Sequence, residues 1–93
     1  FDDGKLQWDL LHIEQIEEVI KVLEYGLTKG YSKDNWKHVA KEDESNMRYY
    51  NACLRHVTSW NKGELIDTES GLPHLAHAIC CLLFQLWKDD NVL

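Results

Sequence analysis

Two histidines stand three residues apart at the start of the most apolar stretch of this sequence, SGLPHLAHAICCLLFQLW, residues 70–87. If the stretch is a helix, His74 and His77 share one face, and Cys81 continues that face one turn later. Two imidazoles on one helical face can hold a divalent metal ion, and Cys81 as a third ligand would make a structural zinc site. Helical histidines are more often packed or hydrogen-bonded residues, so a structural role for the pair stays open.

Carboxylates that could be metal ligands lie on an earlier stretch, LQWDLLHIEQIEEVIKVLEYG. Glu17 and Glu24 are seven residues apart and meet the edge of the apolar stripe of that stretch. Four acids on an amphipathic helix are more often its solvated face. The four acids are Glu14, Glu17, Glu18 and Glu24. Three further acids, Glu64, Asp67 and Glu69, stand in the connector before Pro73.

His56 follows Arg55 in a third stretch, SNMRYYNACLRHVTSW. A histidine that packs between helices is the ordinary interpretation, and a phosphate contact by the Arg55 guanidinium is the functional one. The spacing of the two residues does not decide between them.

The apolar spacing predicts an all-α fold, because it follows the helical period and nothing alternates with period two for more than a few residues. The first helix is expected to end at Gly26 and Gly30. Ser45 is a candidate N-cap for a helix that ends near Trp60 and is terminated by Gly63. Residues 32–40 are expected to form a short helix or an ordered loop. The last helix is expected to have Pro73 in its first turn and to run to about Trp87, after which the chain frays.

The composition predicts one domain of 93 residues with a small core that self-association would help to complete. Asp and Glu outnumber Lys and Arg by 16 to 10, which argues against binding to a nucleic-acid polymer and suits a cation site. The three cysteines are odd in number and two are adjacent, which is typical of reduced thiols in a cytoplasmic protein. The apolar run is too short and too polar for a membrane span or a signal peptide.

The central and C-terminal parts of the chain resemble a known family. RYYNACLRHVTSWNKGELIDTESGLPHLAHAICCLLF, residues 48–84, is similar to the signature region of the phage and bacterial dATP/dGTP diphosphohydrolase N-terminal domain. DDGKLQWDLL and IEEVIKVLEYG, followed by NW, resemble its opening. The resemblance covers residues 2–86 and implies a small MazG-like helical bundle, a homodimer or homotetramer, that hydrolyses a nucleoside triphosphate to monophosphate and pyrophosphate.

The resemblance also implies a set of site residues. In the MazG-type pattern a late helix carries carboxylate metal ligands, and HLAHAICCLL takes the place of that helix here, with His74 and His77 at the ligand positions. It implies that a divalent metal ion binds at Glu17, Glu18, Asp67, His74 and His77. The expected ion is Mg²⁺ or Mn²⁺, and Co²⁺ is also compatible with imidazole ligands. His56 joins Glu17, Glu18, His74 and His77 as a catalytic candidate. The residues expected to meet the nucleotide are Lys5, Lys29 and Arg55 at the triphosphate and Asn35 or Trp36 at the base or sugar.

Motifs for several other chemistries are missing from the sequence: a Gly-rich phosphate loop, HExxH, CxxC, an adjacent His-Asp pair and ExxH. Two alternatives to the enzyme therefore remain. One is a non-catalytic helical interaction module whose histidines stabilise a helix start. The other is the structural zinc site of His74, His77 and Cys81.

Overall fold

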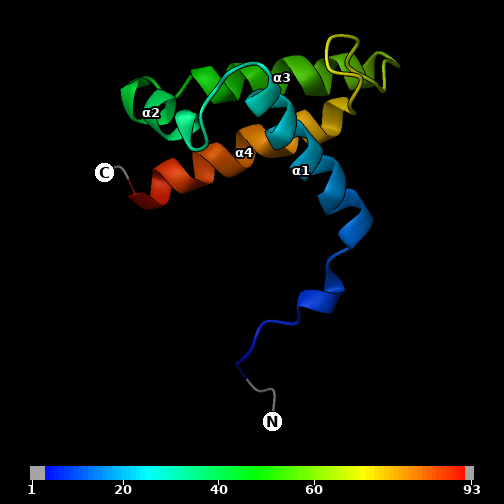
Figure 1. The fold of residues 1–93 in the computed structure, drawn as a ribbon, viewed down its shortest axis with the longest axis horizontal. Helices are drawn as coiled ribbons and strands as arrows, with labels where there is room; N and C mark the ends of the chain where they lie inside the picture. The colour runs from blue at the N-terminus through cyan, green and yellow to red at the C-terminus, as the bar shows by residue number, and fades with distance from the viewer. Residues whose placement is uncertain (1–3, 92–93) are drawn as a thin grey trace.

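The computed structural model describes residues 4–91, and within that range the chain is all-α, as predicted (Figure 1). Residues 1–3, which include the matched Asp2 and Asp3, and residues 92–93 lie outside the description. A short 3₁₀ helix comes first and four α-helices follow it. Their bounds are η1 Trp8–Leu10, α1 Ile13–Thr28, α2 Asn35–Glu42, α3 Arg48–Asn61 and α4 His74–Asn91.

The last helix, α4, is the central element of the bundle, because α1, α2 and α3 all pack against it. Figure 1 shows α3 lying along α4, α1 crossing α4 near its start, and η1 extending away from the other helices. None of the helices in residues 4–91 has the length and apolar character that a membrane crossing would need.

Small side chains on α4 let α1 approach closely. Val19 of α1 packs against Ala76 and Cys80 of α4, and all three are buried. Burial raises the pKa of the Cys80 thiol to about 12 and that of Cys81 to about 11. The thiols are free of disulfides and belong to the core, so Cys80 and Cys81 contribute to helix packing.

An aromatic cluster holds the second half of α4. Phe84 stacks on Trp36 of α2 with ring centroids 4.5 Å apart and meets the Tyr49 ring of α3 edge-on at 5.1 Å. The Tyr49 hydroxyl donates to the Trp36 carbonyl oxygen at 3.1 Å. Of residues 32–40, predicted as a short helix or an ordered loop, positions 35–40 belong to a helix, α2, whose Trp36 ring packs on Phe84.

Two glycines end helices as the sequence predicts. Gly30 and Gly63 have φ of +89° and +100°, a left-handed conformation that glycine adopts without a Cβ clash. After α1, the Tyr31 amide bonds to the Gly26 carbonyl oxygen; after α3, the Glu64 amide bonds to that of Ser59. These are Schellman caps, and they set the direction in which each connector leaves its helix.

Two local predictions are wrong. Ser45 is not the N-cap of α3, which begins at Arg48; instead a carboxylate oxygen of Asp43 accepts the Arg48 amide at 2.9 Å. The chain does not fray after Trp87, because α4 continues to Asn91. Lys88 is buried there and donates to the Asp43 carbonyl oxygen, a long-range contact that the local sequence does not reveal.

Candidate functional site

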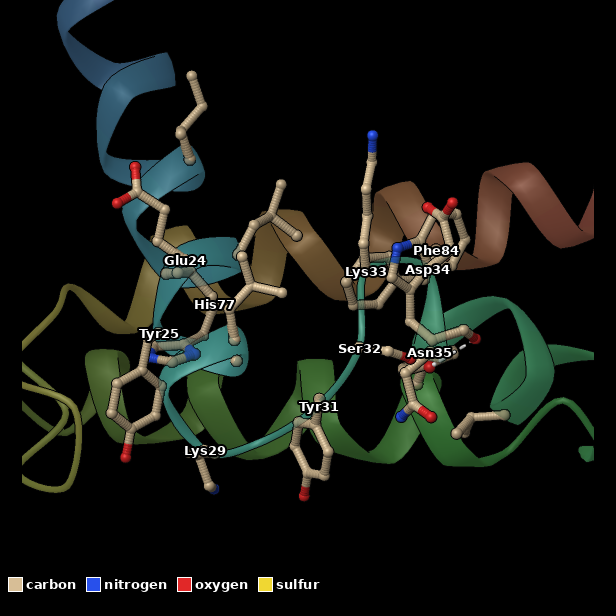
Figure 2. Close-up of a pocket in the computed structure, with 18 of the residues that line it drawn as sticks. Glu24, Tyr25, Lys29, Tyr31, Ser32, Lys33, Asp34, Asn35, His77 and Phe84 are labelled. Carbon is tan, nitrogen blue, oxygen red and sulfur yellow. Dashed lines mark hydrogen bonds between the residues drawn. The ribbon is translucent and has the colours of Figure 1, made fainter.

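A pocket of about 760 Å³ lies between the C-terminal half of α1, the connector to α2, α2, α3, the loop before α4, and α4. Figure 2 shows Tyr25, Lys29 and His77 at one end and Asn35 and Phe84 at the other. The first end carries most of the ionisable groups, so we call it the histidine end; the second is the aromatic end.

His56 of α3 and His77 of α4 meet at the histidine end. Their rings are stacked, with centroids 4.6 Å apart and planes inclined by 9°. Both residues line the pocket. The helix-helix packing of α3 on α4 therefore produces a pair of facing imidazoles from residues 21 positions apart.

The loop before α4 brings a carboxylate to the same end. Its backbone closes on itself and on the helix start, since the Asp67 amide bonds to the Leu72 carbonyl oxygen at 2.9 Å and the His74 amide to that of Leu65 at 3.0 Å. Within this frame the Ser70 hydroxyl lies 2.7 Å from Oδ2 of Asp67 and 2.7 Å from Nε2 of His77. Asp67 Oδ2 itself is 3.7 Å from that imidazole nitrogen.

His74 lies behind the pocket rather than in it. Its side chain is buried, with Nδ1 2.9 Å from Nδ1 of His56 and Nε2 3.1 Å from Oε1 of Glu64. Both ring nitrogens therefore have protein partners. His74 supports His56 in this arrangement, while His77 faces the pocket.

A cation and a carboxylate close the outer side of the histidine end. Lys29 donates to Oε1 of Glu69 at 3.1 Å, and the Tyr25 hydroxyl donates to the same oxygen at 3.2 Å. The contact holds the pKa of the Glu69 carboxyl below its ordinary value and that of Lys29 above it. Because the pair is exposed, it is weak and a competing anion can exchange for Glu69.

Burial sets the protonation of the imidazoles. It lowers the pKa of His56, and the neighbouring His77 and His74 rings lower it further. Burial also lowers the pKa of His77, against the opposing effect of Asp67. For Asp67, burial alone would raise the pKa, but the hydrogen bonds from Ser70 and the two imidazoles outweigh it and the pKa is lowered. Near neutral pH the site thus holds neutral imidazoles beside an ionised carboxylate.

The structure brings together only part of the predicted site. Six of the candidates line the pocket: His56, Asp67, His77, Lys29, Asn35 and Trp36. The remaining candidates lie elsewhere: Glu17 and Arg55 are exposed on α1 and α3, Glu18 pairs with Lys21, and Lys5 is on the exposed segment before η1.

Sequence reasoning missed Ser70 and Glu69 as members of the site. Both lie in the ESGLPH part of the string that carries the family resemblance. That string was a signal for them, but the contacts form only once the loop folds back on α4.

The donors suited to a cation are few. Within residues 4–91, no three His, Cys, Asp or Glu side chains converge closely enough to hold a metal ion by themselves. This also leaves the zinc site of His74, His77 and Cys81 without support in the described part of the chain.

These features define a small all-α domain whose pocket combines an aromatic end with an end made of imidazole, carboxylate and lysine side chains. The chain belongs to the family described as "dATP/dGTP diphosphohydrolase, N-terminal", whose model matches residues 1–92. It is 37% identical, over 91 residues, to a protein of Salmonella phage PMBT28 named dATP/dGTP diphosphohydrolase. The match covers 98% of this chain and 29% of the phage protein, so the chain spans less than a third of that relative. No solved structure matches the chain.

The lowered pKa values of His56 and His77 predict that the metal-free protein loses stability in mild acid. Below the ordinary imidazole pKa of 6.5 the unfolded chain binds protons that the folded chain resists, so the free energy of unfolding falls as the pH drops through that value. Urea unfolding in EDTA at a series of pH values measures this dependence. His56→Gln and His77→Gln should each reduce it, and unchanged slopes in both variants would contradict the assignment.

Proposed function

We propose that this chain is a metal-dependent nucleoside triphosphate pyrophosphohydrolase domain that converts dATP or dGTP to the monophosphate and pyrophosphate. The observation that supports it most is the pocket, which joins a histidine end suited to phosphate chemistry to an aromatic end suited to a base. Its volume of about 760 Å³ falls in the ordinary range for small-ligand sites. The name of the phage relative points to the same substrates.

The two ends of the pocket favour one orientation of the nucleotide. The triphosphate lies toward Lys29, which releases Glu69 and pairs with phosphate oxygens instead. The base lies toward Trp36 and Phe84, whose rings offer stacking surface, with the Asn35 amide available for a hydrogen bond. The α-phosphate then comes to the imidazoles and Asp67.

A divalent cation fits the donors of the histidine end only if the substrate completes its coordination. Asp67 offers a carboxylate and His77 an imidazole, and no third such group joins them within residues 4–91. Mg²⁺ is commonly bound by one or two carboxylates, substrate phosphates and water, and an imidazole also suits Mn²⁺ or Co²⁺. When bound, the cation would supply charge neutralisation at the phosphates and a more acidic water.

The chain's own residues supply the rest of the reaction. A neutral imidazole accepts a proton from water, whose oxygen forms a bond to the α-phosphorus in line with the leaving group. The bond from the α-phosphorus to the oxygen that bridges it to the β-phosphorus breaks, and its electron pair leaves with pyrophosphate. Lys29 balances charge on the departing oxygens. As its phage relative suggests, the reaction would take place in the cytoplasm of a bacterial host.

We also propose that the chain works as a homodimer or homotetramer. Four large apolar residues of α4 form a stripe at helical spacing that faces solvent, each more than 40% exposed: Leu75, Ile79, Leu82 and Leu86. α1 carries a second exposed apolar stripe, in which each side chain is at least 39% exposed: Ile13, Ile20, Leu23 and Leu27. Contiguous apolar surface of this kind marks an interface, and a second copy of the chain offers matching stripes.

Turnover tests the enzymatic proposal. Wild-type protein with dATP or dGTP and Mg²⁺, Mn²⁺ or Co²⁺ should yield monophosphate and pyrophosphate on chromatography. His77→Ala and Asp67→Asn should each lower kcat/KM by about 100-fold or more, the scale of losing a positioned acid or base. His38→Ala, which replaces an exposed histidine outside the pocket, is the matched control. A folded wild-type protein that turns over none of these mixtures would favour the non-catalytic module, for which the fully paired His74 is the supporting observation.

Sedimentation tests the assembly. The wild-type protein should sediment with at least twice the mass of the 10.9 kDa chain. Leu82→Glu places a charge in the middle of the α4 stripe and should lower that mass to that of one chain. Lys62→Glu, at an exposed position beyond the end of α3, is the control. A wild-type mass of 10.9 kDa at high protein concentration would overturn the proposed assembly.

A further inference from the structure

Each of the two stacked pocket imidazoles is held by a chain of hydrogen bonds that ends on a carboxylate. The serine chain runs from His77 through Ser70 to Asp67, with 2.7 Å at each step. The histidine chain runs from His56 through His74 to Glu64, with steps of 2.9 and 3.1 Å. Both chains begin at an imidazole that lines the pocket.

The serine chain determines which nitrogen of His77 carries the proton. The Ser70 hydroxyl has one proton, and the ionised Asp67 carboxylate can only accept, so Ser70 donates to Oδ2 of Asp67. The Ser70 oxygen must then accept from His77, as it does from the Leu72 amide at 3.2 Å. Neutral His77 is therefore protonated at Nε2, and its Nδ1 keeps a lone pair.

The histidine chain imposes the opposite tautomer on His56. Glu64 accepts, so neutral His74 carries its proton at Nε2 and presents a lone pair at Nδ1. His56 must then donate from its own Nδ1 across the 2.9 Å contact. Its Nε2 is left without a proton.

We infer that Ser70 and Glu64 are positioning residues that fix opposite tautomers in His77 and His56, so that each ring offers the pocket one unprotonated nitrogen. Those nitrogens are Nδ1 of His77 and Nε2 of His56, and neither has a partner among residues 4–91. Neither nitrogen is buried. Among residues 4–91, Oε1 of Gln85 is the one side-chain nitrogen or oxygen that is both buried and without a hydrogen-bond partner, so the two unpaired imidazole nitrogens are reached by solvent.

The fixed tautomers matter because only an unprotonated imidazole nitrogen can accept a proton from water or bind a cation. Without the two chains, each ring would be free to place its proton on the nitrogen that faces the pocket. The catalytic consequence rests on the proposed function above, whereas the tautomers themselves follow from the hydrogen bonds alone.

Nitrogen NMR tests the tautomers directly and needs no substrate. In protein labelled with ¹⁵N-histidine, at a pH well above the ordinary imidazole pKa, two-bond proton-nitrogen spectra distinguish a protonated nitrogen from an unprotonated one. We expect His77 to be protonated at Nε2 and His56 at Nδ1. The second assignment is the sharper one, because an unconstrained neutral histidine side chain prefers its proton on Nε2. The same tautomer in both rings would overturn the inference.

Substitutions separate positioning from simple structural support. Glu64→Ala removes the acceptor of the histidine chain and should shift His56 toward protonation at Nε2, while Glu42→Ala, another exposed carboxylate, should leave it unchanged. Ser70→Ala should make the two nitrogens of His77 exchange the proton, and Ser70→Thr, which keeps the hydroxyl, should restore the wild-type spectrum. If His56 in Glu64→Ala and His77 in Ser70→Ala keep their wild-type protonation patterns, the inference is overturned.

Kinetics then link the tautomers to the reaction. Ser70→Ala should lower kcat by about 10- to 100-fold with little change in KM, the scale expected when a supporting hydrogen bond is lost, and Ser70→Thr should recover it. If the wild-type protein shows opposite tautomers but no turnover, the proposed function fails and the positioning of the imidazoles stands. If turnover is normal but both rings carry the same tautomer, the positioning fails and the function stands.

Discussion

The hydrogen bonds of Ser70 are the contact on which the site depends most. One hydroxyl joins the Asp67 carboxylate, the Leu72 amide and the His77 imidazole, and so ties the loop before α4 to the helix itself. Because that loop carries Asp67 and Glu69, its position decides whether these two carboxylates line the histidine end. The backbone bond from the His74 amide to the Leu65 carbonyl oxygen holds the same junction at a second point.

The two ends of α4 have different tasks, which explains the histidines at the start of an apolar helix. Its first turn places His77 at the pocket and His74 behind it, while Ala76 and Cys80 let α1 approach closely. Farther along, Phe84 stacks on Trp36 and forms the aromatic end of the pocket. The helix therefore builds the core and both ends of the candidate site, and displacing it would alter all three together.

Local patterns in the sequence predicted the helical class and the helix ends, which short-range interactions control. Helical spacing indicated the all-α class, and the glycines after α1 and α3 marked the helix ends because their left-handed conformations are intrinsic to glycine. The extension of α4 through Lys88 was missed, since it depends on a contact with a distant part of the chain. The contact of Asp43 with the Arg48 amide is local, and it was missed because more than one polar residue before α3 could serve as its cap. Of the site, His56, Asp67 and His77 do converge, but the role of Ser70 follows from a loop closed by long-range backbone bonds, which residue types and spacing do not encode.

Locating a bound nucleotide would test the proposed site most directly. Backbone amide NMR spectra of the labelled chain, titrated with a dATP analogue that resists cleavage between its α- and β-phosphates in the presence of Mg²⁺, would show which residues respond. We expect saturable shifts at Lys29, Asp67, Ser70 and His77 and at the aromatic end near Asn35. Shifts confined to the exposed face of α1 around Glu17 and Glu18, or none in the pocket at saturating analogue, would contradict it.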